Sequence, residues 1–219
     1  MPRNSRDKSQ NKSAAKNVGD AYVRIIESAR ELFMANGYQA TTTKEISLRA
    51  EVAEPTLFRR FGSKADIFEA SVLPEIAAFI ENVSSTWVEF SKDATYQEMA
   101  ENLVNGLYSL IFENRRVFQE LLAARADPSD DLHSAAAAIS VQLRRGLRLV
   151  HDAGRKLEEE RGLVGLDPPA TVGSIAGLII GAALLDDWIF PSGVRIPGRG
   201  RMITEMSKLI ADGIAHRSA

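Results

Sequence analysis

The amino-acid sequence predicts an all-α fold, in which an N-terminal domain of three helices precedes a larger helical domain. Two observations carry this prediction. Hydrophobic residues form 45% of the 219 residues, and they recur at spacings of three and four, which is the period of amphipathic helices. Strand-like alternation is scarce, and glycine or proline separates the periodic segments, as expected at helix ends. We therefore divide the chain into residues 1–19, 20–70 and 71–219.

The first residues differ in composition from those that follow. Residues 1–19 are rich in Ser, Asn, Lys and Arg and hold almost no large apolar side chain, so we expect a disordered basic arm. A helix should then run from Asp20 to Ala35, because its apolar residues share one face. Gly37 follows this helix and can supply the left-handed cap that commonly ends one.

Residues 41–64 predict two short helices joined by a tight turn. Thr43 is expected to cap a first helix over residues 44–50, because a threonine hydroxyl can accept from unpaired amides of the first turn. Pro55 suits the first turn of a second helix, which should extend from residue 54 or 55 to residue 61. This arrangement is a helix-turn-helix, a unit that lays its second helix in the major groove of DNA.

The second of these helices has a buried side and a polar side. Leu57 and Phe61 are four residues apart and should pack inward together. The outward side offers arginines, a carboxylate that can accept from cytosine, and apolar groups for thymine methyls, which is the chemistry that reads base edges. A merely solvated basic face is the alternative interpretation. The outward residues are Glu54, Pro55, Thr56, Phe58, Arg59 and Arg60.

Helix follows helix in the remainder of the chain. Ser63 should cap a helix that Pro74 ends or kinks. The later helices are delimited by their apolar periodicity and by the prolines and glycines between them. They are expected at residues 75–90, 96–112, 115–125, 130–160, 170–190 and 202–216.

The last two helices are apolar, and a two-fold dimer would pack such pairs into a four-helix bundle. Three glycines at intervals of four line one side of the helix at 170–190, where another backbone could approach closely. The alternative is that both helices close the core of the monomer. The expected interface residues are Gly173, Gly177, Gly181, Leu184, Met206 and Ile210.

Charge is unevenly distributed along the chain. Residues 1–64 hold 12 Lys or Arg against 7 Asp or Glu, whereas the net charge of the whole chain is −2. A basic first domain suits a phosphate backbone. The absence of cysteine excludes disulfides, a thiolate nucleophile and a zinc finger, and we expect neither metal nor cofactor. No secretory signal pattern and no apolar run of roughly 20 residues is present, so a cytoplasmic protein without a membrane partner is expected.

Residues from about 22 to 70 resemble the DNA-binding domain of the TetR (tetracycline-repressor) family of bacterial transcriptional regulators. Two positions depart from the family pattern. Phe58 stands where tyrosine is common, and Glu51 stands where the turn usually has glycine, so a positive φ there would cost about 1 kcal/mol. The matching residues are Ile25, Ala29, Leu32, Phe33, Gly37, Tyr38, Thr42, Thr43, Ile46, Ala50, Val52, Thr56, Leu57, Phe61, Ser63 and Lys64.

The resemblance implies contacts with double-stranded DNA. Thr43 and Lys44 would touch phosphates, and Lys64 would anchor a phosphate at the N-terminus of the next helix. The basic arm would either follow the minor groove or remain a plain tail. Base edges would be faced by Glu54, Pro55 and Thr56, next to Phe58, and the backbone or adjacent bases by Arg59 and Arg60.

The resemblance also implies a homodimer, joined through its last two helices, that leaves a palindromic operator when an unknown small-molecule effector binds the C-terminal domain. A pocket needs aromatic and aliphatic walls with a few polar groups. We therefore expect pocket residues among Trp87, Tyr108, Phe112, Phe118, His133, His151 and Trp188.

The sequence thus predicts a ligand-responsive transcriptional repressor. One alternative is a helical small-molecule-binding protein with a vestigial helix-turn-helix, and the departures at Glu51 and Phe58 keep this alternative open. The other is an all-α enzyme, which has little support because the three histidines are scattered and neither a zinc-protease motif nor a phosphate loop is present.

Overall fold

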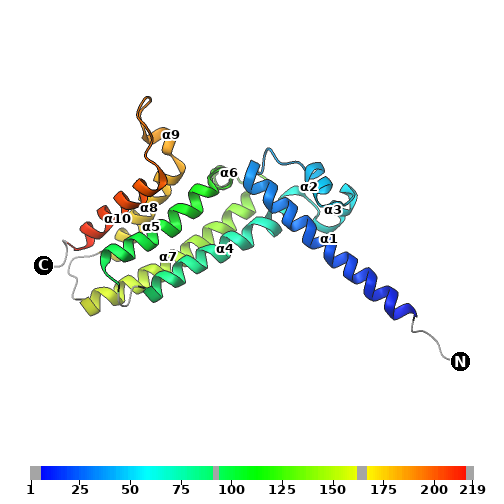
Figure 1. Cartoon of the computed structure of the whole chain (residues 1–219), viewed down its shortest axis with the longest axis horizontal. Helices are drawn as coiled ribbons and strands as arrows, with labels where there is room; N and C mark the ends of the chain where they lie inside the picture. The colour runs from blue at the N-terminus through cyan, green and yellow to red at the C-terminus, as the bar shows by residue number, and fades with distance from the viewer. Residues whose placement is uncertain (1–5, 91–93, 162–166, 216–219) are drawn as a thin grey trace. The chain divides into compact units, whose positions relative to one another are not determined.

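The computed structural model describes residues 6–90, 94–161 and 167–215, and every regular element within these ranges is a helix (Figure 1). The all-α prediction is confirmed. Two compact units divide the chain between Pro74 and Glu75. The helices are α1 (Arg6–Asn36), α2 (Thr43–Arg49), α3 (Glu54–Phe61), α4 (Lys64–Phe90), α5 (Tyr96–Glu113), α6 (Arg115–Ala126), α7 (His133–Arg161), α8 (Pro168–Leu184), α9 (Asp186–Ile189) and α10 (Arg199–Ala215).

The first unit is built on the apolar face of α1. Ile25, Ala29 and Phe33 are fully buried, and their spacing of four places them on one side of the helix. The ring of Phe33 lies 5.8 Å from that of Tyr38 and 5.2 Å from that of Phe68. Such offset or edge-on aromatic contacts add to the stability that burial alone provides. This core fixes α1 against α2 and the start of α4.

Helix α1 starts earlier than expected. Its first residue is Arg6, whereas the sequence predicted a disordered arm over residues 1–19 and a helix from Asp20. Residues 6–19 therefore continue the helix, and the first five residues lie outside the described part. The segment contains Ala14 and Ala15 and no proline or glycine between Arg6 and Val18, so nothing local stops a helix from extending backwards.

Helix α4 continues through Pro74, where we expected an end or a kink between two helices. The proline lacks an amide and removes one hydrogen bond of the ladder. Val72 and Ile76, on either side of it, are both buried, and burial of this kind outweighs local propensity. The separate helix predicted over residues 75–90 is therefore the second part of α4.

The second unit packs its helices around aliphatic contacts. α5 packs against α8 and α10, and α7 packs against α6 and α8. Two glycines allow close approach to α4: a Cβ at Gly106 would lie 2.9 Å from a methyl of Val83, and one at Gly146 would lie 2.6 Å from the Ser84 hydroxyl. Among the described helices, none has the length and hydropathy that crossing a membrane requires.

The apolar helix predicted over residues 170–190 is divided in the structure. α8 ends at Leu184, and the four-residue α9 follows after Leu185. Two side chains from α6 hold this break. Gln119 donates to the Leu184 carbonyl over 3.0 Å, and Arg115 pairs with Asp186 over 3.0 Å. The bond from Gln119 satisfies a carbonyl at the end of α8 that a longer helix would have paired internally.

Candidate nucleic-acid interface

Helix α2 begins at a reciprocal cap formed by Thr42 and Glu45. The Glu45 amide donates to the Thr42 hydroxyl over 3.1 Å, and the Thr42 amide donates to the Glu45 carboxylate over 2.8 Å. The prediction that Thr43 caps this helix is wrong by one residue. Only Thr42 has a glutamate three positions later, and that pair satisfies two backbone amides at once. Thr43 is instead the first residue of α2.

The turn between α2 and α3 contains a glutamate in a left-handed conformation. Glu51 has a φ of 53°, as the family resemblance implied for this position. The amides of Glu51 and Val52 donate to the carbonyls of Leu48 and Ser47 over 3.2 and 3.0 Å. This pair of bonds is the Schellman arrangement that usually has glycine at its left-handed residue. The turn therefore keeps its hydrogen bonds and bears the strain of a side chain.

Helix α3 has the bounds that the sequence predicted, Glu54–Phe61, with Pro55 in its first turn. Leu57 is fully buried and anchors the helix. Phe61 is only half-buried, contrary to the expectation of full burial, because its ring stacks on the exposed ring of Tyr22 at 5.4 Å. Gly62, with a φ of 88°, ends the helix.

A hydrogen bond joins the beginnings of the two short helices. The Thr43 hydroxyl, at the start of α2, donates to Oε1 of Glu54, at the start of α3, over 2.6 Å. Both side chains are half-buried. The single proton of the hydroxyl is thus engaged with a carboxylate. The expected pairing of Thr43 with a phosphate would require this hydroxyl to turn away from Glu54.

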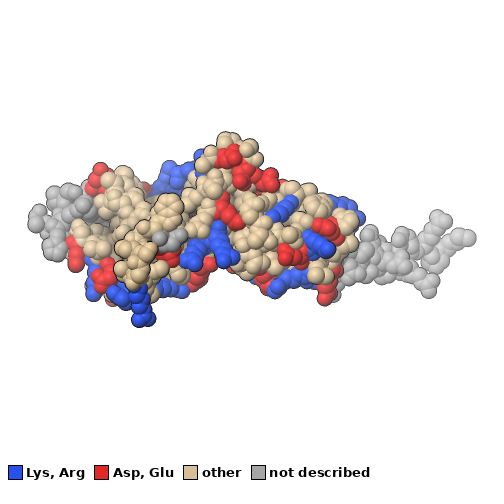
Figure 2. All heavy atoms as spheres, turned by 90° about the horizontal axis from the view of Figure 1, so that it is seen from above, with Lys and Arg blue, Asp and Glu red and all other residues tan. Residues whose placement is uncertain are grey.

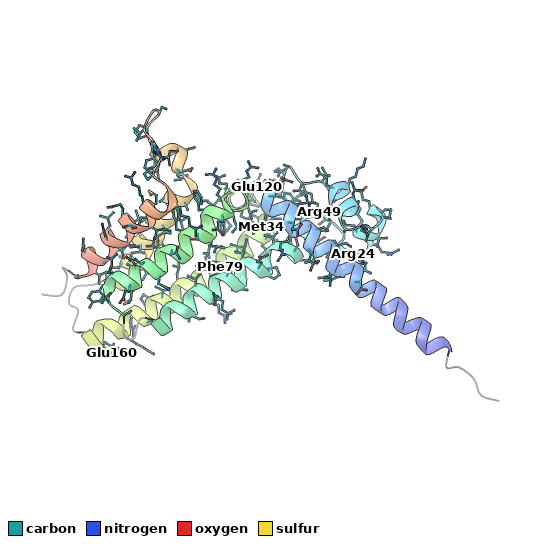
Figure 3. The ribbon with its side chains drawn as sticks, viewed as in Figure 1. Arg24, Met34, Arg49, Phe79, Glu120 and Glu160 are labelled. Carbon is teal, nitrogen blue, oxygen red and sulfur yellow. The ribbon has the colours of Figure 1, made fainter. Side chains whose placement is uncertain are left out.

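Helix α1 braces the pair through two arginine contacts that sequence reasoning did not identify. Arg24 on α1 donates from Nε to the carbonyl of Ala50, where α2 ends, over 3.0 Å. Arg49 at the end of α2 forms an ion pair with Glu31 of α1. Figure 3 labels both arginines on their helices. Both partners lie more than fifteen residues away in the sequence, so no local pattern indicates them.

The basic side chains predicted to contact DNA lie at three places on this unit. Lys44 is exposed on α2, Arg59 is exposed on α3, and Arg60 is half-buried beside it. Within the part of the chain that the structure describes, these three form no ion pair. Lys64 begins α4, and its ammonium lies 4.1 Å from the centre of the Tyr38 ring, a cation–π contact that holds the lysine in place.

The remaining predicted contact residues lie on α3. Pro55 is exposed, Thr56 is half-buried, and Phe58 has 40% of its surface exposed. Ser63 caps α4 as predicted, accepting from the Asp66 amide over 3.1 Å. The face shown in Figure 2 has Lys and Arg interspersed with Asp and Glu, without one continuous basic field.

The predicted pocket residues that the structure describes differ in burial and in their contacts. The rings of Tyr108 and Phe112 stack at 5.4 Å, and burial, with the Asp186 carboxylate nearby, raises the pKa of the Tyr108 hydroxyl. Phe118 is buried elsewhere in the core, and Trp188 has 83% of its surface exposed.

The other three predicted pocket residues are two histidines and a tryptophan. Nδ1 of His133 lies 3.0 Å from the Ala124 carbonyl, and Nδ1 of His151 lies 3.0 Å from the carboxylate of its neighbour Asp152. The side chain of Trp87 lies outside the described residues. Each histidine thus has a local partner that accounts for its position.

A groove and two cavities lined by described residues of the second unit have other residues in their walls. A cavity of about 20 Å³ between α4, α5 and α7 has almost wholly aliphatic walls, with the Ser84 hydroxyl as a polar exception. Sequence reasoning missed it because it searched for aromatic walls. Its lining is Ile80, Val83, Ser84, Leu103, Leu107, Leu110, Leu143, Gly146, Leu147 and Val150.

The residues predicted for a dimer interface fall into two groups. Apart from the backbone of α8 itself, no atom of the described residues lies within 4 Å of a Cβ placed on Gly173, Gly177 or Gly181, so this side of α8 is open. By contrast, Leu184, Met206 and Ile210 are buried within the chain itself, at 3%, 3% and 7% exposure. The glycines thus remain candidates for an interface, whereas the three larger side chains mainly fill the core of the chain, although Ile210 also lines a groove of about 270 Å³ between α8 and α10.

Comparison with known proteins shows which family model the helix-turn-helix in the first unit matches. Residues 25–71 match the family model described as bacterial regulatory proteins, tetR family. An uncharacterized HTH-type transcriptional regulator of Bacillus subtilis, YvkB, is 49% identical over 47 residues, which are 22% of this chain and 25% of that protein. A fatty acid metabolism regulator protein of the same organism is 28% identical over 90 residues, 41% of this chain and 45% of that protein. The chain therefore spans less than half the length of either relative.

Most of the chain also shares its fold with a solved structure. A putative TetR-family transcriptional regulator from Mesorhizobium loti superposes with a TM-score of 0.69, at 18% identity, over 92% of this chain and 98% of that one. The fold and the site define a helix-turn-helix protein of the class found in bacterial regulators. Its N-terminal helix-turn-helix, residues 25–71, is thus a DNA-binding domain of the TetR family.

Proposed function

We propose that the chain is a dimeric transcriptional repressor that binds a palindromic operator and releases it when a small molecule binds the second unit. The presentation of α3 carries the DNA-binding part of this proposal. Leu57 is fully buried, whereas Phe58 and Arg59 on the other side of the helix are exposed. A helix anchored by its inner face can enter a major groove with its outer side chains.

The positions of the basic residues support separate roles in DNA binding. Lys44 and Lys64 lie at the starts of α2 and α4, where helix N-termini favour phosphate. The side chains at the start of α3 would face base edges, and its basic end would contact the backbone or adjacent bases. In this proposal the first set is Glu54, Pro55 and Thr56, and the second is Arg59 and Arg60.

Dimerisation is supported by an open apolar face on α8 and α10. Leu178 and Leu209 are 41% and 65% exposed and line a groove of about 270 Å³ between these helices. The open side of Gly177 lies on the same helix as Leu178. A second copy packed there would cover this apolar surface. To bind a palindromic operator, the two α3 helices of such a dimer would have to enter the major groove roughly 34–36 Å apart.

The aliphatic cavity between α4, α5 and α7 supports an apolar effector. Its volume of about 20 Å³ is close to that of a single water molecule, so an effector would have to displace these helices. α4 contributes Ile80 and Val83 to the cavity and begins with Lys64. A displacement of α4 would therefore be a direct route from the effector to a DNA-binding residue, in the cytoplasm where such a regulator acts.

A mobility-shift assay with the DNA upstream of its own gene tests the proposal. The expected result is a specific band in low salt that disappears at high salt, because phosphate contacts release counterions. Absence of a specific band from the intact dimer would contradict it. Such a result would favour the alternative of a small-molecule-binding protein with a vestigial helix-turn-helix, although the intact hydrogen bonds around Glu51 support a working motif.

A further inference from the structure

The Thr43–Glu54 pair has a geometry suited to reading one base. Each residue is the first of its helix, and the bond between them spans 2.6 Å. Helix N-termini carry a partial positive charge, and Glu54 lies at the N-terminus of α3. A negative charge is stabilised at this position.

The bond leaves the second carboxylate oxygen available. Thr43 donates to Oε1 of Glu54, and in the described part of the chain Oε2 accepts no hydrogen bond. Glu54 is half-buried, and its neighbour Pro55 is exposed. This oxygen can therefore accept a hydrogen bond from a donor on DNA.

An ionised carboxylate accepts hydrogen bonds and donates none, so it can pair only with a donor. In the major groove the base donors are the N4 amino group of cytosine and the N6 amino group of adenine. The adenine donor lies beside the N7 acceptor, which repels a carboxylate, whereas the cytosine donor lies beside a carbon. Cytosine is therefore the base that best fits a carboxylate oxygen such as Oε2 of Glu54.

We propose that Glu54 reads a cytosine in each operator half-site and that Thr43 is the positioning residue that fixes the carboxylate for this contact. The proposal rests on the DNA-binding function proposed above and names one base of its target. Thr43 then serves sequence preference rather than phosphate binding. A purely structural bond between α2 and α3 would use the same atoms, so the test must measure base preference as well as affinity.

Four proteins separate these roles: the wild type, Glu54→Gln, Thr43→Val and Thr43→Ser. An operator is first selected from random duplexes with the wild type, and each half-site position is then changed to every other base pair. The wild type should prefer cytosine at one position by about tenfold to a hundredfold. Glu54→Gln should move the preference there to adenine, because an amide can bond both N6 and N7.

Thr43→Val keeps the shape of the side chain and removes the hydroxyl, so it should reduce the preference for cytosine at that same position. Thr43→Ser restores the donor and should restore the preference. Thermal unfolding of each variant shows whether it is folded, and a variant that binds phosphates normally should keep the salt dependence of the wild type.

Three results would overturn the proposal. If Glu54→Gln keeps the base preference of the wild type at every position, the bond is structural. If Thr43→Val keeps full selectivity, Thr43 does not position Glu54. If the wild type selects no duplex at all, the DNA-binding function fails together with this inference, which distinguishes that failure from the other two.

Discussion

The amide of Val52 donates to the carbonyl of Ser47 over 3.0 Å, and this bond closes the turn around Glu51. Glu51 is the residue in that turn with a positive φ, 53°. A side chain in this conformation costs about 1 kcal/mol or more. The helix-turn-helix therefore carries strain that glycine would remove.

Replacing Glu51 by glycine should stabilise the protein. The expected gain is about 0.5–1 kcal/mol, because relief of the left-handed strain exceeds the extra chain entropy of glycine. Chemical denaturation should show a higher midpoint at an unchanged slope. Glu51→Ala is the matched control, since its Cβ keeps the left-handed strain at this position, and this variant should not gain the stability that glycine gives. A Glu51→Gly protein less stable than the wild type would contradict the assignment.

Acid should weaken the start of α2 through Glu45. Bonds from the amide and the hydroxyl of Thr42 hold the pKa of Glu45 below its ordinary value of 4.5. Because the folded pKa is the lower one, the stabilisation is fully present above about pH 4.5 and is lost as the pH falls through the folded pKa. Thr42→Ala should therefore reduce stability at neutral pH and lose less on acidification than the wild type.

A second capping box provides an internal comparison for this pH effect. Thr95 and Glu98 form the same bonds at the start of α5 and lower the pKa of Glu98. Thr95→Ala should show the same convergence with the wild type at low pH. A stability difference that stays constant from about pH 7 to about pH 3 would count against the carboxylate bonds as its source.

Two kinds of basic residue should have different effects on DNA binding. Arg59→Ala and Arg60→Ala should each weaken binding. Lys64→Ala should weaken binding equally on all sequences and reduce the salt slope by about 1, as expected for one lost phosphate contact. Fluorescence anisotropy over a range of salt concentrations measures both effects. Arg125→Ala, at an exposed position on α6, is the control and should leave both unchanged. A Lys64→Ala protein with altered base preference would refute its assignment to phosphate.

The open face of α8 makes a prediction about assembly. Gly177→Leu places a Cβ where the described residues outside the backbone of α8 have no atom within 4 Å, so the fold should tolerate it. If α8 packs against a second copy, the leucine should separate the dimer, which sedimentation velocity detects. Gly154→Leu on α7 is equally open within the chain and should leave the assembly intact. Dimers of equal strength in both variants would exclude this face as the interface.

The helix-turn-helix was accessible from the sequence because its determinants are local. Pro55 indicates the first turn of α3, and the spacing of four between Leu57 and Phe61 indicates how far the helix extends. The cap of α2 was misplaced by one residue because three threonines stand in a row, and only the glutamate at position 45 selects Thr42. The strain at Glu51 was accessible because the family pattern has glycine there.

The rest of the molecule depends on contacts between distant residues. Arg199 pairs with Glu113 across 86 positions and also donates to the Ser109 hydroxyl, both over 2.6 Å. These bonds fix the start of α10, and no short pattern encodes them. The positions of the predicted pocket residues also depend on such packing, which buries Phe118 and leaves Trp188 exposed.

The central claim is that α3 reads a specific DNA sequence, and a competition experiment tests it most directly. The wild-type protein is bound to a duplex selected from a random pool, and unlabelled selected or shuffled duplex is added at near-physiological salt. The account predicts that the selected duplex competes at least about a thousandfold better than the shuffled one. Equal competition by the two duplexes would contradict it.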